Sequence, residues 1–238
     1  MDDYLGLEAF DDARRLIVVA AHPDDLETMC GGTIALLAQR KVEIFSVNCT
    51  LGDIGAPDDV MSRHSLASVR LAETGNAAQL LGIRCTFNLG HPDGELLAGL
   101  ELRAQIARLY RITQADTVLT FDPYWTGQIH PDHRAAGQAA LDAFMPSKMP
   151  LYHPEQFEDP RAEPGAVERL LLFSTDREPD VYMDVTAIYH TKLEACMAHI
   201  SQFPDGEDSL EWMKEIDRAD GERIGVTYAE SFRRVELW

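Results

Sequence analysis

The apolar run at residues 16–21 constrains the fold most, because it is short, continuous and rich in β-branched residues. Such a run is typical of a parallel strand buried on both faces. His22, Pro23, Asp24 and Asp25 follow it directly. Proline cannot continue the strand, and in open α/β sheets the ligand crevice lies just beyond the carboxyl ends of the strands. The run therefore predicts a buried parallel sheet with a functional site at its edge.

Further strands and helices alternate along the chain. Apolar, β-branched runs predict strands at 42–50, 85–89, 117–121, 170–173 and 180–184, and helical spacing predicts helices at 33–40, 65–82, 100–112, 134–143 and 186–199. Ser65 is the expected N-cap of the second helix. The alternation implies βαβ units with right-handed crossovers. We expect an α/β fold: a Rossmann-like, doubly wound, mainly parallel sheet with helices on both faces.

Length and charge limit the class of protein. The 238 residues can fill one core and show no linker, so a single domain over 1–238 is expected. No apolar run is long enough to span a bilayer, and the acidic first residues do not resemble a secretory signal, which favours the cytoplasm. The net charge of −19 repels phosphate backbones and anionic lipid. Nucleic acid and membranes are therefore not expected as partners.

The sequence also lacks several common motifs. The four cysteines form no C-x-x-C pair, which argues against a disulfide framework or a thiolate zinc site and favours free, buried thiols. No G-x-G-x-x-G follows the first strand, and no Walker A sequence is present. Nucleotide binding is therefore not supported by any motif.

Histidine and aspartate residues follow two of the predicted strands. His22, Asp24 and Asp25 follow the first strand, and the sequence H-P-D-H at 130–133 follows the strand at 117–121. One His-Pro-Asp-Asp string could be only a capped turn, in which aspartate accepts backbone N–H bonds. Two such clusters at the ends of buried strands favour a metal site instead.

The side-chain types suggest which of these residues bind the metal and which act as acid or base. Imidazole and carboxylate groups are zinc ligands, and a catalytic zinc site needs three protein ligands and an open position for water. His22, Asp25 and His133 would supply that set. Asp24 and His130 would then stand beside the metal as the acid and base that metal-assisted hydrolysis requires.

Arg70 and Glu73 lie one turn apart on the predicted helix at 65–82. From this spacing alone, an intrahelical salt bridge worth a few tenths of a kcal/mol is the favoured interpretation.

Together these motifs resemble the LmbE/PIG-L family of zinc-dependent N-deacetylases. The resemblance covers nearly the full chain and rests on A-H-P-D-D at 21–25, G-G-T at 31–33, R-x-x-E at 70–73, L-G at 81–82 and H-P-D-H at 130–133. The segments at 201–205 and 221–233 further resemble the diacetylchitobiose deacetylase branch. Members of this branch remove an acetyl group from N-acetylglucosamine units.

The resemblance implies a role for each residue of the two clusters. It implies zinc held by His22, Asp25 and His133, with Asp24 as the general base. His130 would stabilise the oxyanion or protonate the departing amine.

The resemblance also bears on residues outside these clusters. It implies that Arg70 and Asp93 contact the sugar, which replaces the salt-bridge interpretation of Arg70. The family often has glutamate directly after the paired aspartates, whereas this chain has Leu26 and then Glu27. The branch resemblance implies a homo-oligomer.

The predicted function is zinc-dependent removal of the N-acetyl group from N-acetylglucosamine, or from a short sugar that contains it, with release of acetate. The strongly negative charge favours a neutral sugar. Two alternatives remain: a zinc amidase acting on a thiol-sugar conjugate or another non-sugar amide, and a non-catalytic module that binds a small ligand.

Overall fold

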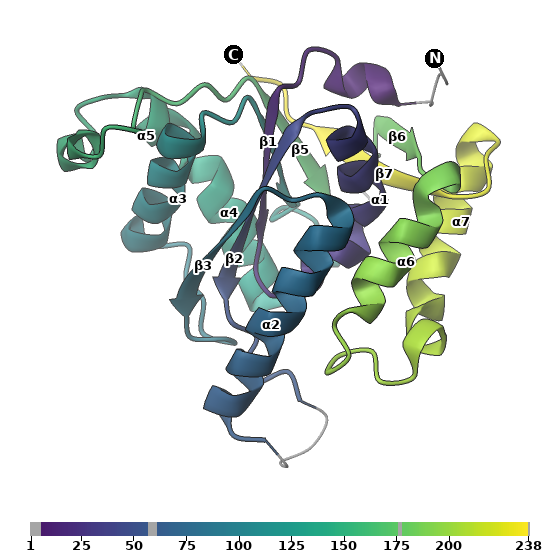
Figure 1. Ribbon diagram of the computed structural model, residues 1–238. Helices are drawn as coiled ribbons and strands as arrows, with labels where there is room; N and C mark the ends of the chain where they lie inside the picture. Colours follow the sequence, from purple (N-terminus) through teal and green to yellow (C-terminus); the bar gives the residue numbers. More distant parts are fainter. Residues whose placement is uncertain (1–5, 57–60, 176–177, 238) are drawn as a thin grey trace.

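The computed structural model describes residues 6–56, 61–175 and 178–237, so the acidic first five residues lie outside it. Within these ranges one seven-stranded sheet has the order β3-β2-β1-β4-β5-β7-β6 (Figure 1). The strands, in sheet order, are Cys85–His91, Glu43–Thr50, Arg15–Ala20, Thr117–Phe121, Arg169–Phe173, Ala229–Arg234 and Val181–Asp184. β7 runs antiparallel to both of its neighbours, and the other pairs are parallel. The predicted α/β fold with a mainly parallel sheet is confirmed.

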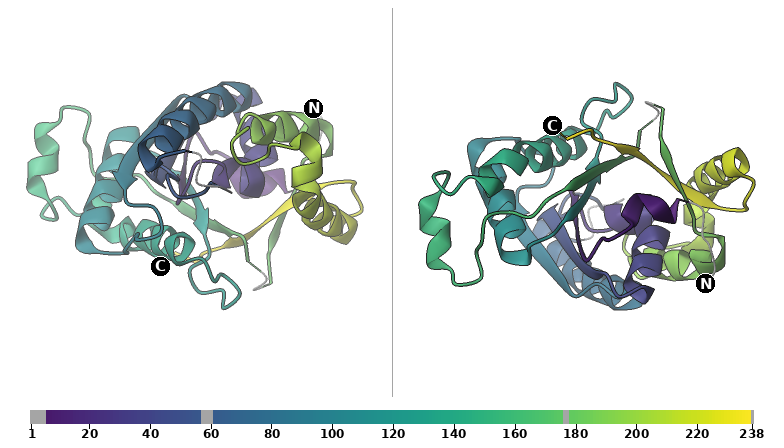
Figure 2. Two further views of the ribbon diagram at one scale, coloured as in Figure 1. Left: turned by 90° about the horizontal axis from the view of Figure 1, so that it is seen from below. Right: turned by 90° about the horizontal axis from the view of Figure 1, so that it is seen from above.

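Helices cover both faces of the sheet (Figure 2). They are α1 (Asp25–Gln39), α2 (Arg63–Leu81), α3 (Leu100–Thr113), α4 (Pro131–Asp142), α5 (Phe144–Lys148), α6 (Tyr189–Met197) and α7 (Glu211–Ile224). Short 3-10 helices lie at Leu7–Phe10, Pro154–Glu158, Thr186–Ile188 and Gly206–Leu210. α1, α2 and α6 pack together in one layer, whereas α3, α4 and α5 form the other. No helix among the described residues is both long and apolar enough to cross a membrane.

The central strand β1 brings the two sequence clusters together. Its residues from Leu16 onward are buried, and it pairs with β2 on one side and β4 on the other. α4 lies close against β4, because a Cβ on Gly137 would come within 2.4 Å of the Phe121 carbonyl oxygen. The first turn of α4, which carries residues 131–133, therefore stands beside the carboxyl end of β1.

The starts of four helices differ from prediction; α4 begins at Pro131 rather than at residue 134, and α6 at Tyr189 rather than at residue 186. α1 begins at Asp25 rather than at residue 33, with a break at Cys30, where φ is −149°. The Glu230 carboxylate accepts the N–H groups of Gly32 at 2.9 Å and Thr33 at 2.7 Å, so the break leaves these donors satisfied. α2 is capped by Ser62, whose hydroxyl accepts the N–H of Ser65, so the prediction of Ser65 as the cap is wrong.

The last helix and strand, α7 and β7, were not predicted. β7 carries glutamate and arginine residues in its six-residue sequence, which hides the apolar pattern of a strand. All four cysteines are free, as predicted; three of them are buried, but the prediction of burial is wrong for Cys85, which is exposed.

Candidate active site

The turn between β1 and α1 orients two aspartates differently. Asp24 occupies the N-cap position with φ 94°, in the left-handed region, and its side chain makes no capping bond. The Asp25 Oδ2 atom instead accepts the backbone N–H groups of Ala21 at 3.0 Å and His22 at 2.7 Å. A non-glycine residue in this conformation costs of order 1–3 kcal/mol and is found most often at functional sites. In this conformation the Asp24 carboxylate accepts no hydrogen bond from the first amides of α1.

His22 is surrounded by carboxylates. Its Nε2 atom lies 3.1 Å from Asp93 Oδ1 and 3.2 Å from Asp132 Oδ2, and its Nδ1 atom lies 3.4 Å from Asp25 Oδ2. Burial lowers the pKa of His22, but Asp25 and then Asp93 outweigh it and raise that pKa to about 11. The position therefore stabilises positive charge strongly.

α4 supplies two further imidazoles. His133 Nε2 lies 3.3 Å from Asp25 Oδ1, and its ring stacks on buried Phe121 with centroids 4.0 Å apart. The Nδ1 atom of His130 accepts the backbone N–H of Asp132 at 3.2 Å, so in neutral His130 the proton is on Nε2. Burial, His133 and His22 all lower the pKa of His130, which favours this neutral form.

The arrangement fits a metal ion. Among the described residues, two groups of ligand atoms lie within 4.8 Å of one another: His22 with His130 and His133, and His22 with Asp93 and Asp132. Asp25 contacts both His22 and His133 through different oxygens. Imidazole and carboxylate donors suit zinc and similar divalent cations, so this is a candidate metal centre. The ligand set His22, Asp25 and His133 stays a prediction.

Arg70 is 3% exposed and contacts the turn between β1 and α1. Its Nη2 atom is 3.1 Å from Asp24 Oδ2 and also donates to the Pro23 carbonyl, while Nη1 donates to the Gly52 carbonyl at 2.9 Å. A Cβ on Gly52 would lie 2.1 Å from Nη1, so only glycine fits there. Burial raises the pKa of Asp24 to about 6, even though Arg70 opposes the shift.

Glu73 does not pair with Arg70. Its carboxylate accepts the N–H and the hydroxyl of Ser201, both at 2.7 Å, which joins α2 to the segment after α6. The salt-bridge interpretation of the Arg70–Glu73 spacing is therefore wrong. The contact of Arg70 with a sugar stays a prediction.

Asp132 was not assigned a role from the sequence, although it lies between the two histidines of the H-P-D-H motif. It is fully buried, and its carboxylate accepts the N–H groups of Gly94 at 2.7 Å and Leu96 at 3.1 Å. These bonds hold the loop after β3, so that Asp93 lies against His22. The second Asp93 oxygen accepts the Ile54 N–H at 3.2 Å. Contact of Asp93 with substrate stays a prediction.

Comparison with known proteins identifies the family. The family model described as PIG-L, GlcNAc-PI de-N-acetylase, matches residues 17–144, which is more than half of the chain and includes the histidine and aspartate clusters. The chain belongs to the PIG-L family.

Three relatives of this PIG-L family chain match between 80% and 98% of its length. Diacetylchitobiose deacetylase from Thermococcus kodakarensis is 30% identical, over 98% of this chain and 87% of that protein. A probable N-acetyl-alpha-D-glucosaminyl L-malate deacetylase 2 from Bacillus anthracis is 31% identical over 80% of this chain and 82% of its own. The solved N,N'-diacetylchitobiose deacetylase from Pyrococcus horikoshii superposes with a TM-score of 0.90 at 32% identity, covering 97% of this chain and 86% of that one.

A buried charged cluster supports α1 in this PIG-L family member. Lys192 Nζ lies 2.8 Å from Glu230 Oε1 and 2.7 Å from Asp217 Oδ2, and the Tyr189 hydroxyl donates to the same Asp217 oxygen at 2.8 Å. These residues come from α6, α7 and β7, and Glu230 binds the break in α1. Sequence reasoning missed the cluster, because its members lie on three elements that only the fold brings together.

Proposed function

We propose that this chain is a zinc-dependent N-deacetylase that removes the acetyl group from N-acetylglucosamine or a short sugar containing it, such as diacetylchitobiose. The observation that carries the proposal is the meeting of the two sequence clusters: His22, His130 and His133 bring ligand atoms within 4.8 Å of one another, and Asp24, two residues after His22, has a carboxylate paired with Arg70 and no bond to the helix end. The substrates of two relatives support the substrate class, since diacetylchitobiose and N-acetyl-alpha-D-glucosaminyl L-malate both contain an N-acetylated glucosamine unit.

His22, Asp25 and His133 would hold the zinc ion. The contacts of Asp25 support this assignment, because its two oxygens lie against His22 and His133, and imidazole and carboxylate groups together suit zinc. When bound, zinc lowers the pKa of a coordinated water to about 7 and polarises a carbonyl oxygen.

Asp24 takes the proton of the attacking water. Arg70 fixes the carboxylate in place, and a pKa of about 6 leaves Asp24 ionised at neutral pH while keeping it basic enough to accept a proton. The Nε2–H of His130 donates a hydrogen bond to the acetamide oxygen as negative charge develops there. Protonated Asp24 then passes this proton to the amine, and the C–N bond breaks to release the amino sugar and acetate; His130 could serve as the donor only in its protonated form. Arg70 and Asp93 contact the sugar ring.

Three wider properties belong to the same proposal. The chain forms a single domain, it assembles as a homo-oligomer, and it works in the cytoplasm. A neutral sugar is the preferred substrate, because the net charge of −19 disfavours the approach of anions.

The test is an acetate-release assay with metal analysis of the same preparation. The substrates are N-acetylglucosamine, diacetylchitobiose, N-acetylglucosaminyl malate and a non-sugar acetamide. We expect zinc at one per chain and the fastest release from a neutral sugar. Release from the non-sugar acetamide alone would favour a different amidase. Protein that carries no metal and releases no acetate would support a binding module instead.

A further inference from the structure

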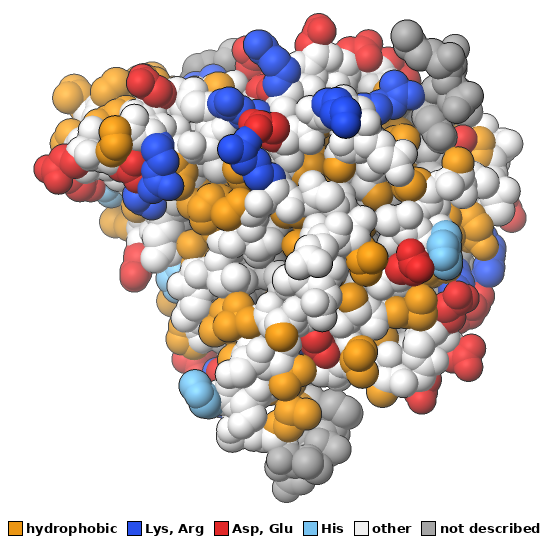
Figure 3. Space-filling view, viewed as in Figure 1, with side chains coloured by type: hydrophobic (Ala, Val, Ile, Leu, Met, Phe, Trp, Pro, Cys, Tyr) orange, Lys and Arg blue, Asp and Glu red, His pale blue; other side chains and the backbone are white. Residues whose placement is uncertain are grey.

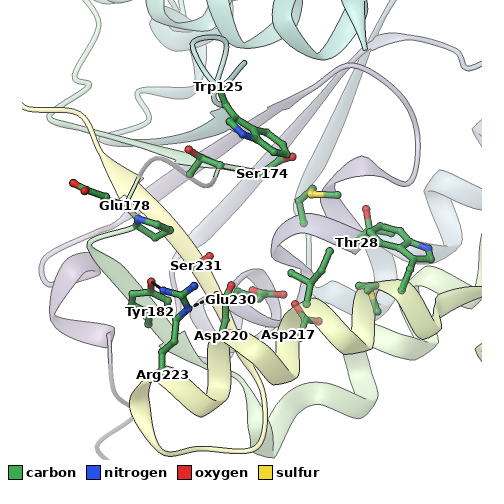
Figure 4. Close-up of a pocket in the computed structure, with 16 residues that line it drawn as sticks. Thr28, Trp125, Ser174, Glu178, Tyr182, Asp217, Asp220, Arg223, Glu230 and Ser231 are labelled. Atoms are coloured by element: carbon green, nitrogen blue, oxygen red, sulfur yellow. Dashed lines mark hydrogen bonds and ion pairs between the residues drawn. The ribbon is translucent and has the colours of Figure 1, made fainter. Parts of the chain in front are cut away.

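A large cavity lies beside the active site, outside the residues assigned to catalysis. It has a volume of about 590 Å³, within the range of small-ligand sites. α1, α7, β6 and β7 contribute to its walls, together with residues that follow β4 and β5. Figure 4 shows Trp125 entering from the loop after β4, opposite Asp217, Asp220 and Arg223 of α7.

The cavity shares structural elements with the proposed catalytic site. Thr28 lines the cavity, and its hydroxyl contacts the backbone carbonyls of Asp24 and Asp25 at 3.1 Å each. Trp125 belongs to the segment that leads into His130. One wall of the cavity therefore begins within one helical turn of Asp24 and Asp25, and another belongs to the segment that carries His130.

The lining of the cavity has the chemistry of a sugar site. Trp125 and Trp212 offer flat aromatic faces, and Trp212 is 45% exposed. Arg223 adds a planar donor group, whose Nε atom lies 3.7 Å from Asp220 Oδ1 and whose Nη1 atom lies 3.5 Å from the Tyr182 hydroxyl. A pyranose ring has an apolar C–H face that packs on tryptophan and hydroxyl groups at its edge that bond carboxylates and guanidinium.

We propose that this cavity binds the second sugar ring of a substrate whose first ring is deacetylated beside Asp24. This inference rests on the proposed function and adds a site that selects for the number of sugar rings in the substrate. A disaccharide then gains binding energy that a monosaccharide lacks. Because this energy comes from a ring that does not react, it favours the disaccharide in kcat/KM.

The experiment compares kcat/KM for N-acetylglucosamine and diacetylchitobiose in zinc-loaded wild-type protein, Trp212→Ala and Arg223→Gln. Tyr152→Ala is the matched control, since Tyr152 is 47% exposed and does not line the cavity. We expect Trp212→Ala to lower kcat/KM for the disaccharide about tenfold, and Arg223→Gln to lower it severalfold. Both variants should stay within about twofold of wild type on the monosaccharide. Equal losses on both sugars, or no loss on either, would overturn the proposal.

A binding measurement separates this inference from the proposed function. Asp24→Asn and the double variant Asp24→Asn with Trp212→Ala, both zinc-loaded, are titrated calorimetrically with diacetylchitobiose. Weaker binding in the double variant supports the subsite even if wild-type protein deacetylates neither sugar. Equal affinity in the two proteins, or no binding in either, rejects the subsite regardless of which substrate is turned over.

Discussion

At Asp24 the backbone adopts φ 94° and directs the carboxylate to Arg70, at 3.1 Å, rather than to the helix amides. Asp24→Asn keeps the shape of the side chain but removes its basicity. We predict that zinc stays bound while kcat falls by a factor on the order of 10² or more. Steady-state kinetics on metal-loaded protein tests this. A near-normal kcat would remove Asp24 from its role as base.

His133 and His130 stack on one another, with centroids 4.4 Å apart, yet their expected roles differ. His133 contacts Asp25, whereas His130 binds the Asp132 amide. We predict that His133→Ala loses most of its zinc after mild chelation and that His130→Ala retains it. Zinc analysis of the two purified variants checks this prediction. If His133→Ala retained zinc and His130→Ala lost it, His130 would be the ligand and His133 the acid.

The break in α1 depends on a residue almost 200 positions away in the chain. Glu230 caps Gly32 and Thr33 and also pairs with buried Lys192. Glu230→Gln leaves part of the Lys192 charge uncompensated, so we predict a loss of about 3–5 kcal/mol in the free energy of unfolding.

Urea unfolding of Glu230→Gln against Glu222→Gln measures this effect, because Glu222 is an exposed glutamate near the end of α7. The control should stay within about 0.5 kcal/mol of wild type. A similar small change in Glu230→Gln would mean that the buried cluster contributes little to stability.

The same cluster predicts a pH dependence of stability. Burial raises the pKa of Asp217 to about 6, and Lys192 only partly opposes the shift. Between the usual aspartate pKa and about 6, the folded state holds a proton that the unfolded state has lost. The stability that this proton on Asp217 contributes is fully present below the pKa of aspartate in the unfolded chain and is lost as pH rises through about 6.

The free energy of unfolding of wild-type protein should therefore fall by up to about 3 kcal/mol, relative to that of Asp217→Asn, between about pH 4 and pH 7. Denaturant titrations of both proteins at several pH values give the difference in unfolding free energy. A difference that does not change with pH would show that Asp217 stays ionised throughout this range.

Across the whole molecule, charge is unevenly distributed. On the face in Figure 3, basic side chains gather toward the top, over the amino ends of the strands. Arg15 and Arg169 begin β1 and β5. Toward the carboxyl ends of the strands, Arg63 is paired with Asp53 at 2.8 Å, and Arg134 donates to the Gln128 carbonyl. Asp58 and Asp59, in the segment between β2 and α2, lie outside the described residues.

We therefore predict a preference for neutral over phosphorylated acetamido sugars. kcat/KM for the neutral sugar should barely change as salt shortens the Debye length from about 10 Å at 0.1 M to about 3 Å at 1 M. An ionic-strength series on both sugars makes the comparison. Preference for the phosphorylated sugar, weakening with salt, would mean that a local basic site such as Arg70 outweighs the net charge.

The sequence by itself determined the parallel sheet and the edge at which the site lies, because buried strands and helices leave local periodic patterns. It also determined the two His-Pro-Asp clusters, since each is contiguous. Only the tertiary structure decided the partners of Arg70, Glu73 and Asp132, because these contacts join distant segments and spacing along one helix suggested a different pairing. The contact of Glu230 with the break in α1 likewise needed the fold, since its partners Gly32, Thr33 and Lys192 lie far from it in the chain.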